Sequence, residues 1–210
     1  MFRCLPILAT MALLTVVTPA TASQPVDSTK ICRDLIAEAE VRHRLPKLLM
    51  SAISLAESGR WNEQRKATIA WPWTVYAEGR GRYLPSKAAA LAEVRELRRQ
   101  GVRNIDVGCT QVNLHFHGDA FATLEEALDP ARNIEFAARF LRKLHRETRS
   151  WSMAAGYYHS RTAKLNRPYR GRVLKHWSNE RRRVAEERRQ AARAAFLDRR
   201  AAWQEGQKGG

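Results

Sequence analysis

Apolar residues recur with helical spacing in two successive stretches near the start of the chain. The first stretch follows Asp27, a good helix cap, and predicts a helix that ends at about His43. The second begins at Pro46, a residue suited to a first helical position, and its apolar stripe stops at Glu57. Gly59 then favours termination, so Glu57 is predicted at the C-terminal end of a helix.

Aromatic and β-branched residues replace this helical pattern between Ile69 and Leu84. The turn sequence at residues 78–81 interrupts them, which predicts a β-hairpin. A helix is expected from Ser86 to Gly101, and Asn104–Val107 is a candidate third strand.

Three further segments have helical patterns: Gln111–Phe116, Pro130–Thr148 and Ser150–Tyr158. Helices therefore outnumber strands, and the fold class predicted for residues 23–165 is one predominantly helical α+β domain with a small hairpin or three-stranded sheet. Large apolar residues become sparse past about Arg172. Residues 166–210 are expected to form either a long, exposed basic helix or a partly disordered tail.

Positive charge is concentrated in that last segment. The chain has a formal net charge of +16, and residues 161–210 hold 15 Lys and Arg against 5 Asp and Glu. Such a surface suits either an anionic envelope surface or simple solvation as a charged helix. Nucleic acid is not an expected partner, because the N-terminus predicts export.

The first 22 residues have the pattern of a cleavable signal peptide. Arg3 gives a basic start, residues 5–17 are an apolar run too short to span a bilayer, and residues 20–22 are small. We expect a soluble periplasmic or otherwise exported protein, with an uncleaved anchor as the alternative. In an oxidising compartment, Cys32 and Cys109 favour one disulfide over two buried thiols.

Candidate chemistry lies in four short sequences. In chain order they are Glu57-Ser58-Gly59, Asp106-Val107-Gly108-Cys109-Thr110-Gln111-Val112-Asn113, Asp129-Pro130-Ala131-Arg132-Asn133-Ile134, and Trp151 with Ala155-Gly156-Tyr157-Tyr158-His159-Ser160. This succession resembles the lytic transglycosylase (SLT) domain, a lysozyme-like family, and in particular its secretion- and invasion-associated branch. The resemblance covers about residues 31–160. Cys109 with Thr110, and His159 with Ser160, depart from the family pattern.

The resemblance implies that Glu57 is the catalytic residue and that peptidoglycan glycan strands are the substrate. It places Ser58 beside the acid, Gln111 and Asn113 in the cleft, and Tyr158 close to Glu57. Other candidate substrate contacts lie on the hairpin and beside Tyr158: Trp73, Tyr76 and His159. In the family no metal or organic cofactor takes part, and the product is a 1,6-anhydro sugar formed without water.

For this chemistry Glu57 must be protonated near neutral pH, which requires a pKa about two units above 4.3. The helix terminus supplies only part of that shift. We expect apolar walls to supply the rest by desolvation, with Tyr158, Val112 and Trp73 as candidates.

Several alternatives remain open at this stage. Asp106 is either a strand-end residue or a second carboxylate, which would allow a muramidase that uses water. A cleft that only holds glycan would make the protein a scaffold for a secretion or flagellar machine. The aromatic residues Trp71, Trp73, Tyr76 and Tyr83 either stack on sugars or pack the sheet. His115 and His117 do not share a helix face, so a zinc site is not expected.

Overall fold

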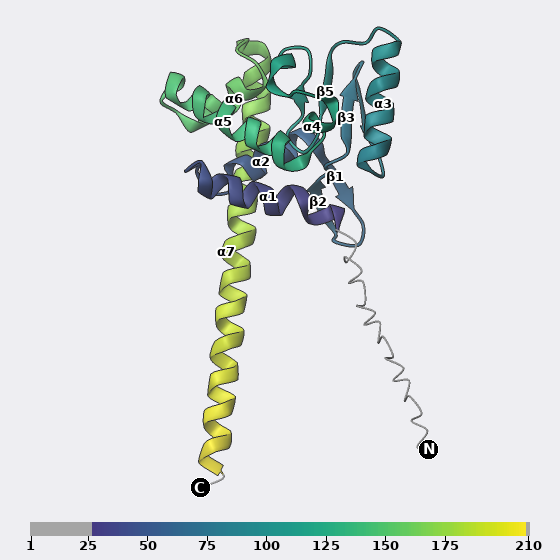
Figure 1. The fold of residues 1–210 in the computed structure, drawn as a ribbon. Helices are drawn as coiled ribbons and strands as arrows, with labels where there is room; N and C mark the ends of the chain where they lie inside the picture. The colour runs from purple at the N-terminus through teal and green to yellow at the C-terminus, as the bar shows by residue number, and fades with distance from the viewer. Residues whose placement is uncertain (1–26, 209–210) are drawn as a thin grey trace, which may run out of the picture.

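The computed structural model describes residues 27–208, so the signal peptide expected over residues 1–22 lies outside the described part. Figure 1 shows a group of packed helices beside a small sheet, with the C-terminal helix projecting far from both. The predominantly helical α+β fold predicted from the sequence is confirmed. Within residues 27–208, no helix is both long and apolar enough to cross a membrane.

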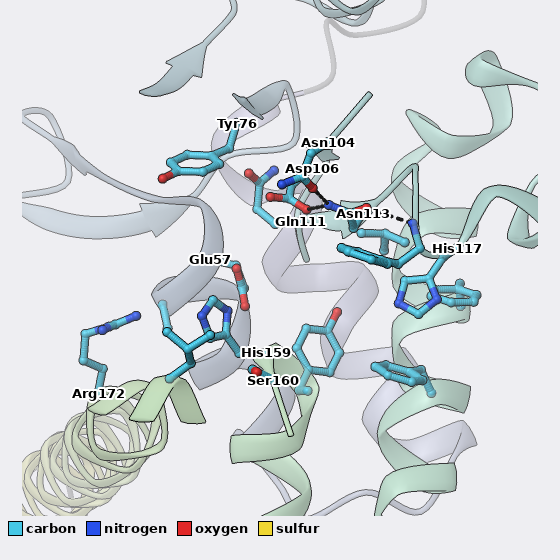
Figure 2. Close-up of a pocket in the computed structure, with 17 residues that line it drawn as sticks. Glu57, Tyr76, Asn104, Asp106, Gln111, Asn113, His117, His159, Ser160 and Arg172 are labelled. Carbon is cyan, nitrogen blue, oxygen red and sulfur yellow. Dashed lines mark hydrogen bonds between the residues drawn. The ribbon is translucent and has the colours of Figure 1, made fainter. Parts of the chain in front are cut away.

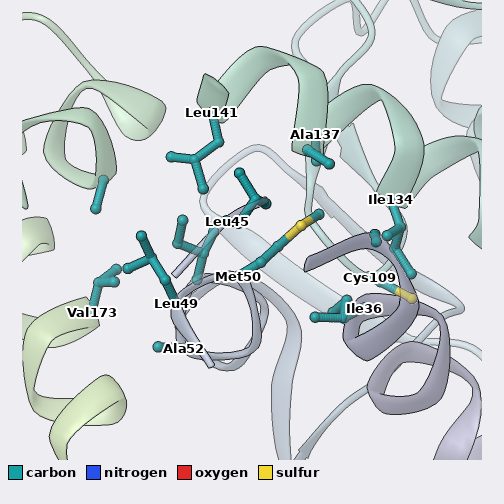
Figure 3. Packing of buried hydrophobic residues seen from close by; sticks show 14 of the residues in the cluster. Ile36, Leu45, Leu49, Met50, Ala52, Cys109, Ile134, Ala137, Leu141 and Val173 are labelled. Atoms are coloured by element: carbon teal, nitrogen blue, oxygen red, sulfur yellow. The ribbon is translucent and has the colours of Figure 1, made fainter. Parts of the chain in front are cut away.

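Five helices form the larger of two cores. They are α1 (Ser28–Arg42), α2 (Leu49–Ser58), α5 (Pro130–Thr148), α6 (Trp151–His159) and the start of α7 (Ala163–Lys208). Side-chain caps fix three of their N-termini, since Asp27, Asp129 and Ser150 each accept a hydrogen bond from a backbone N–H of the first turn. Figure 3 shows the side chains that meet inside, among them Leu49, Leu141 and Val173.

The second core lies against a four-stranded antiparallel sheet in the order β4-β3-β5-β6. Its strands are β3 (Thr74–Ala77), β4 (Arg80–Tyr83), β5 (Ile105–Val107) and β6 (Val112–Asn113). Helices α3 (Lys87–Arg99) and α4 (Leu124–Ala127) add apolar side chains to this core, and a 3-10 turn spans Gly118–Ala120. The predicted hairpin, the helix after Ser86 and the strand at 104–107 are confirmed.

A separate two-stranded sheet, β1 (Gly59–Asn62) with β2 (Ala67–Ala70), follows α2 directly and was not predicted. Gly59 makes this junction, because a Cβ there would collide with the carbonyl oxygen of Leu55. The chain therefore passes from the end of a helix into a strand within one residue.

The predicted helix at Gln111–Phe116 is wrong. Gln111 has a positive φ of 47°, and Val112 pairs with Val107 as part of β6. The side chain of Asn113 then accepts hydrogen bonds from the N–H groups of His115 (2.9 Å) and Phe116 (3.0 Å). This local turn replaces the backbone bonds that a helix would need.

The helix α2 begins at Leu49, three residues later than Pro46, because Leu48 has a left-handed conformation with φ 67°. The buried carboxylate of Glu40 takes the place of an N-cap. It accepts hydrogen bonds from the N–H groups of Leu48 (2.7 Å), Met50 (2.8 Å) and Ser51 (3.1 Å). A side chain from α1 therefore satisfies the free donors at the start of α2.

The C-terminal segment is one continuous helix, so the helical alternative holds for residues 163–208. Its first turns belong to the domain, because Tyr169 and Val173 are buried in the helical core and Trp177 donates a hydrogen bond to the carbonyl of Lys47 (2.8 Å). The expected boundary at residue 165 therefore divides packed residues. From Ala185 onward the described side chains are exposed.

The expected disulfide is present between Cys32 and Cys109, whose Cα atoms lie 5.7 Å apart. It joins α1 to the segment between β5 and β6, and closes a loop with a sequence separation of 77 residues. On the chain-entropy model, a loop of this length contributes about 4 kcal/mol to stability.

Replacing Glu40 with Ala should lower the free energy of unfolding by about 3 kcal/mol, because buried N–H groups at the start of α2 lose their acceptor. Denaturant melts give the value. The control is Glu38→Ala on the same helix, whose side chain is 65% exposed and which should change stability by less than about 0.5 kcal/mol. Equal effects of the two substitutions would contradict the capping role.

Candidate functional site

A cavity of about 640 Å³ lies between the helices and the four-stranded sheet, and residues from both parts line it. Figure 2 shows its labelled residues, which come from the end of α2, the four-stranded sheet and its loops, the segment before the 3-10 turn, the end of α6, and α7. Its walls combine acids and amides with aromatic rings. The acids and amides are Glu57, Asp106, Asn104, Gln111 and Asn113.

Glu57 lines this cavity from the last turn of α2, where the sequence predicted it. The hydroxyl of Tyr169 donates a hydrogen bond to its Oε1 at 2.6 Å. Tyr169 belongs to α7 and is 1% exposed, so the C-terminal helix holds the Glu57 carboxyl group through a buried contact. Glu57 itself is half-buried, and its accessible atoms face the cavity.

Burial raises the pKa of Glu57 to about 8. The hydrogen bond from Tyr169 and the charge of Arg172 lower this pKa, whereas the charge of Asp106 raises it, and desolvation is the largest of these effects. At pH 7 most Glu57 side chains are therefore neutral and can donate a proton.

Asp106, in β5, lines the same cavity as Glu57. Burial raises its pKa as well, although its Oδ1 accepts a hydrogen bond from Asn113 Nδ2 at 2.7 Å, which lowers it. The same amide nitrogen donates to Asn104 Oδ1 at 2.6 Å. Asn113 therefore orients an acid at the wall, and the cavity holds a second carboxyl group besides Glu57.

The loop between β5 and β6 is built around the buried side chain of Asn133. Its Nδ2 donates to the Val107 carbonyl (3.0 Å), and its Oδ1 accepts from both the N–H (3.1 Å) and the hydroxyl (2.8 Å) of Thr110. Gly108 has φ 85°, and a Cβ there would overlap Asn133. The absence of a side chain at Gly108 lets the Asn133 side chain approach the backbone of the loop closely.

Gln111 and Tyr158 both line the cavity. The amide nitrogen of Gln111 donates to the carbonyls of Thr74 (3.1 Å) and Gly108 (3.0 Å), which leaves its amide oxygen as the atom that can accept a hydrogen bond from a ligand. Tyr158 donates its hydroxyl proton to the Thr110 carbonyl at 2.9 Å. Its ring is therefore a fixed wall beside Glu57.

Two of the predicted substrate contacts do not reach the cavity. Ser58 is fully buried and donates its hydroxyl to the Cys109 carbonyl at 2.7 Å, which ties the end of α2 to the β5–β6 loop. Trp73 is 9% exposed, packs in the sheet core with Trp71 and does not line the cavity, so it is not the apolar wall of the site that was expected. Tyr76 and His159 do line the cavity, and so does Val112.

Sequence reasoning missed Tyr169 and Arg172, because both lie beyond the expected end of the domain. Their signal was the spacing of Tyr169, Val173 and Trp177, which are four residues apart and form one apolar face. It also missed an aromatic wall made by Phe116, Phe136 and Phe140.

Comparison with protein-family models, with curated proteins and with solved structures finds no match to this chain. Within residues 27–208, no cluster of three or more His, Cys, Asp and Glu side chains could hold a metal ion.

Glu57→Gln should make the protein more stable than the parent at high pH. The unfolded parent releases this proton near pH 4.5 and the folded parent near pH 8, so its stability falls as pH rises between these values. The advantage of the Gln variant should grow over that window, by up to about 5 kcal/mol, and level off above pH 8.

Denaturant melts from pH 4 to 9 measure this difference. The matched control is Glu63→Gln, which removes an exposed carboxyl group from the β1–β2 turn. A pH-independent difference between the parent and Glu57→Gln would contradict the raised pKa.

Proposed function

We propose that the protein is a peptidoglycan lytic transglycosylase that cleaves the β-1,4 bond between N-acetylmuramic acid and N-acetylglucosamine. The observation that carries the proposal is a neutral, half-buried Glu57 facing an open cavity, with its pKa near 8 and a tyrosine hydroxyl on its Oε1. Amide side chains and aromatic rings, which suit sugar hydroxyls and pyranose faces, line the same cavity.

In this proposal Glu57 first gives its proton to the glycosidic oxygen, and the bond from that oxygen to C1 of the muramic acid breaks. The substrate's own N-acetyl group supports the positive charge at C1. The Glu57 carboxylate then takes the proton of the muramic acid 6-hydroxyl, while the oxygen of that hydroxyl attacks C1. The product is a 1,6-anhydro sugar, and Glu57 is protonated again without water.

Asp106 favours a second candidate, a muramidase that hydrolyses the same bond. Enzymes that add water use two carboxyl groups, one as acid and the other as base or nucleophile. Asp106 lines the cavity with Glu57, and its charge acts on the pKa of Glu57. Its bond to Asn113 supports the alternative view, in which it only orders the cavity wall.

Mass spectrometry of fragments released from purified sacculi separates these candidates. The transglycosylase produces anhydro ends, which are lighter by one water than the reducing ends of a muramidase. Glu57→Gln should lower release at least about 100-fold, because it removes the acid. A folded parent that binds sacculi and releases no fragment would instead make the protein a scaffold.

Tyr169→Phe should move the alkaline limb of the pH–activity profile to higher pH by about one unit. The lost hydrogen bond stabilises the Glu57 carboxylate, so its removal raises the pKa further. Tyr157→Phe on α6, a tyrosine whose ring packs under Arg161, is the control and should leave the limb in place. A shift to lower pH in Tyr169→Phe would contradict this role.

We further propose that the protein acts in the periplasm after export, without a metal or organic cofactor. The exposed part of α7 would rest on an anionic envelope surface or meet a secretion or flagellar machine. Deletion of residues 185–208 tests the contact of α7 with the envelope surface, and loss of envelope association at low salt is the expected outcome.

A further inference from the structure

Arg172 brings a positive charge to the cavity from the side of α7. It follows Tyr169 by one helical turn, and its guanidinium lies 5.4 Å from the centre of the Tyr169 ring. Figure 2 shows it at one edge of the pocket, with Glu57 and His159 on its inner side and Asp106 farther away. The residue is exposed, so a bound ligand can reach it.

No carboxylate within residues 27–208 lies within 4.0 Å of the Arg172 guanidinium. Its nearest acid along the cavity wall is Glu57, which is neutral at pH 7 and already accepts the Tyr169 hydroxyl. The cation is therefore available to a ligand. A guanidinium offers several N–H donors in one plane, and a carboxylate accepts two of them at once.

The other basic groups of the cavity do not carry charge at neutral pH. His159 stacks on Tyr169 with ring centres 4.6 Å apart. Burial of the His159 ring and the charge of Arg172 lower the pKa of His159 below 6.5. Burial and the charge of Lys143 likewise lower the pKa of His117. Among the lining residues Arg172 is the one permanent cation.

We infer that Arg172 is a specificity-determining residue that binds a carboxylate carried on the lactyl arm of a muramic acid residue in the glycan strand. This inference rests on the proposed function, and it adds that an anionic substituent, not the sugar backbone alone, selects the substrate. The carboxylate has two sources. In strands stripped of peptide it is the lactyl group itself, and in intact strands it belongs to the attached peptide.

The test measures binding to the full-length protein carrying Glu57→Gln, so that no substrate is consumed. The probes are a neutral N-acetylglucosamine hexamer, peptide-free glycan strands and peptide-bearing strands. At low salt, at least one of the anionic strands should bind about tenfold more tightly than the hexamer, and about 0.5 M salt should reduce that ratio.

Adding Arg172→Gln should abolish both the preference and its salt dependence, whereas Arg172→Lys should retain part of each. Arg167→Gln, an exposed arginine on the same helix that does not line the cavity, is the matched control and should keep the preference. The strand whose preference depends on Arg172 identifies the source of the carboxylate. Thermal melts establish that each variant is folded.

Two outcomes overturn the inference in different ways. If all three probes bind with equal affinity, or if Arg172→Gln keeps the preference, Arg172 does not select the substrate, while the proposed function stands. If none of the probes binds to the folded Glu57→Gln protein, the proposed function fails and the inference fails with it.

Discussion

The candidate site depends on keeping one carboxyl group partly out of water, in the cavity between the helices and the four-stranded sheet. Glu57 is placed there by the end of α2, and burial is the largest influence on its pKa, which rises to about 8. An uncompensated buried carboxylate is costly, so the folded state favours its neutral form. The folded protein is therefore less stable at alkaline pH, in exchange for an acid that is ready to donate at pH 7.

The surrounding elements fix that acid from three directions. Ser58 ties the end of α2 to the Cys109 carbonyl, and the disulfide from Cys32 ties the same segment to α1. Asn133 holds the loop that carries Gln111. The helix α7 closes the third side through Tyr169, so the long C-terminal helix is part of the site at its base while most of its length remains exposed.

Sequence predicted what depends on local signals. The cap Asp27 marked the first helix, and the end of an apolar stripe placed Glu57 correctly at the end of the second. The prediction failed where side-chain hydrogen bonds set the backbone conformation. Hydrophobic periodicity does not show the positive φ of Gln111 or the turn made by Asn113. Aromatic residues of the hairpin could not be divided in advance between core and cavity, so Trp73 was misplaced. Tyr169 was missed because the domain appeared to end before it.

The ionisation of Glu57 tests this account most directly. Infrared difference spectra between the parent and Glu57→Gln, recorded from pH 4 to 10, isolate the C=O stretch of this one carboxylic acid. The account predicts a protonated carboxyl band that persists through pH 7 and disappears with a midpoint near 8. Loss of that band near pH 4.5 would mean that Glu57 is an ordinary solvated carboxylate, and the proposed chemistry would have no acid.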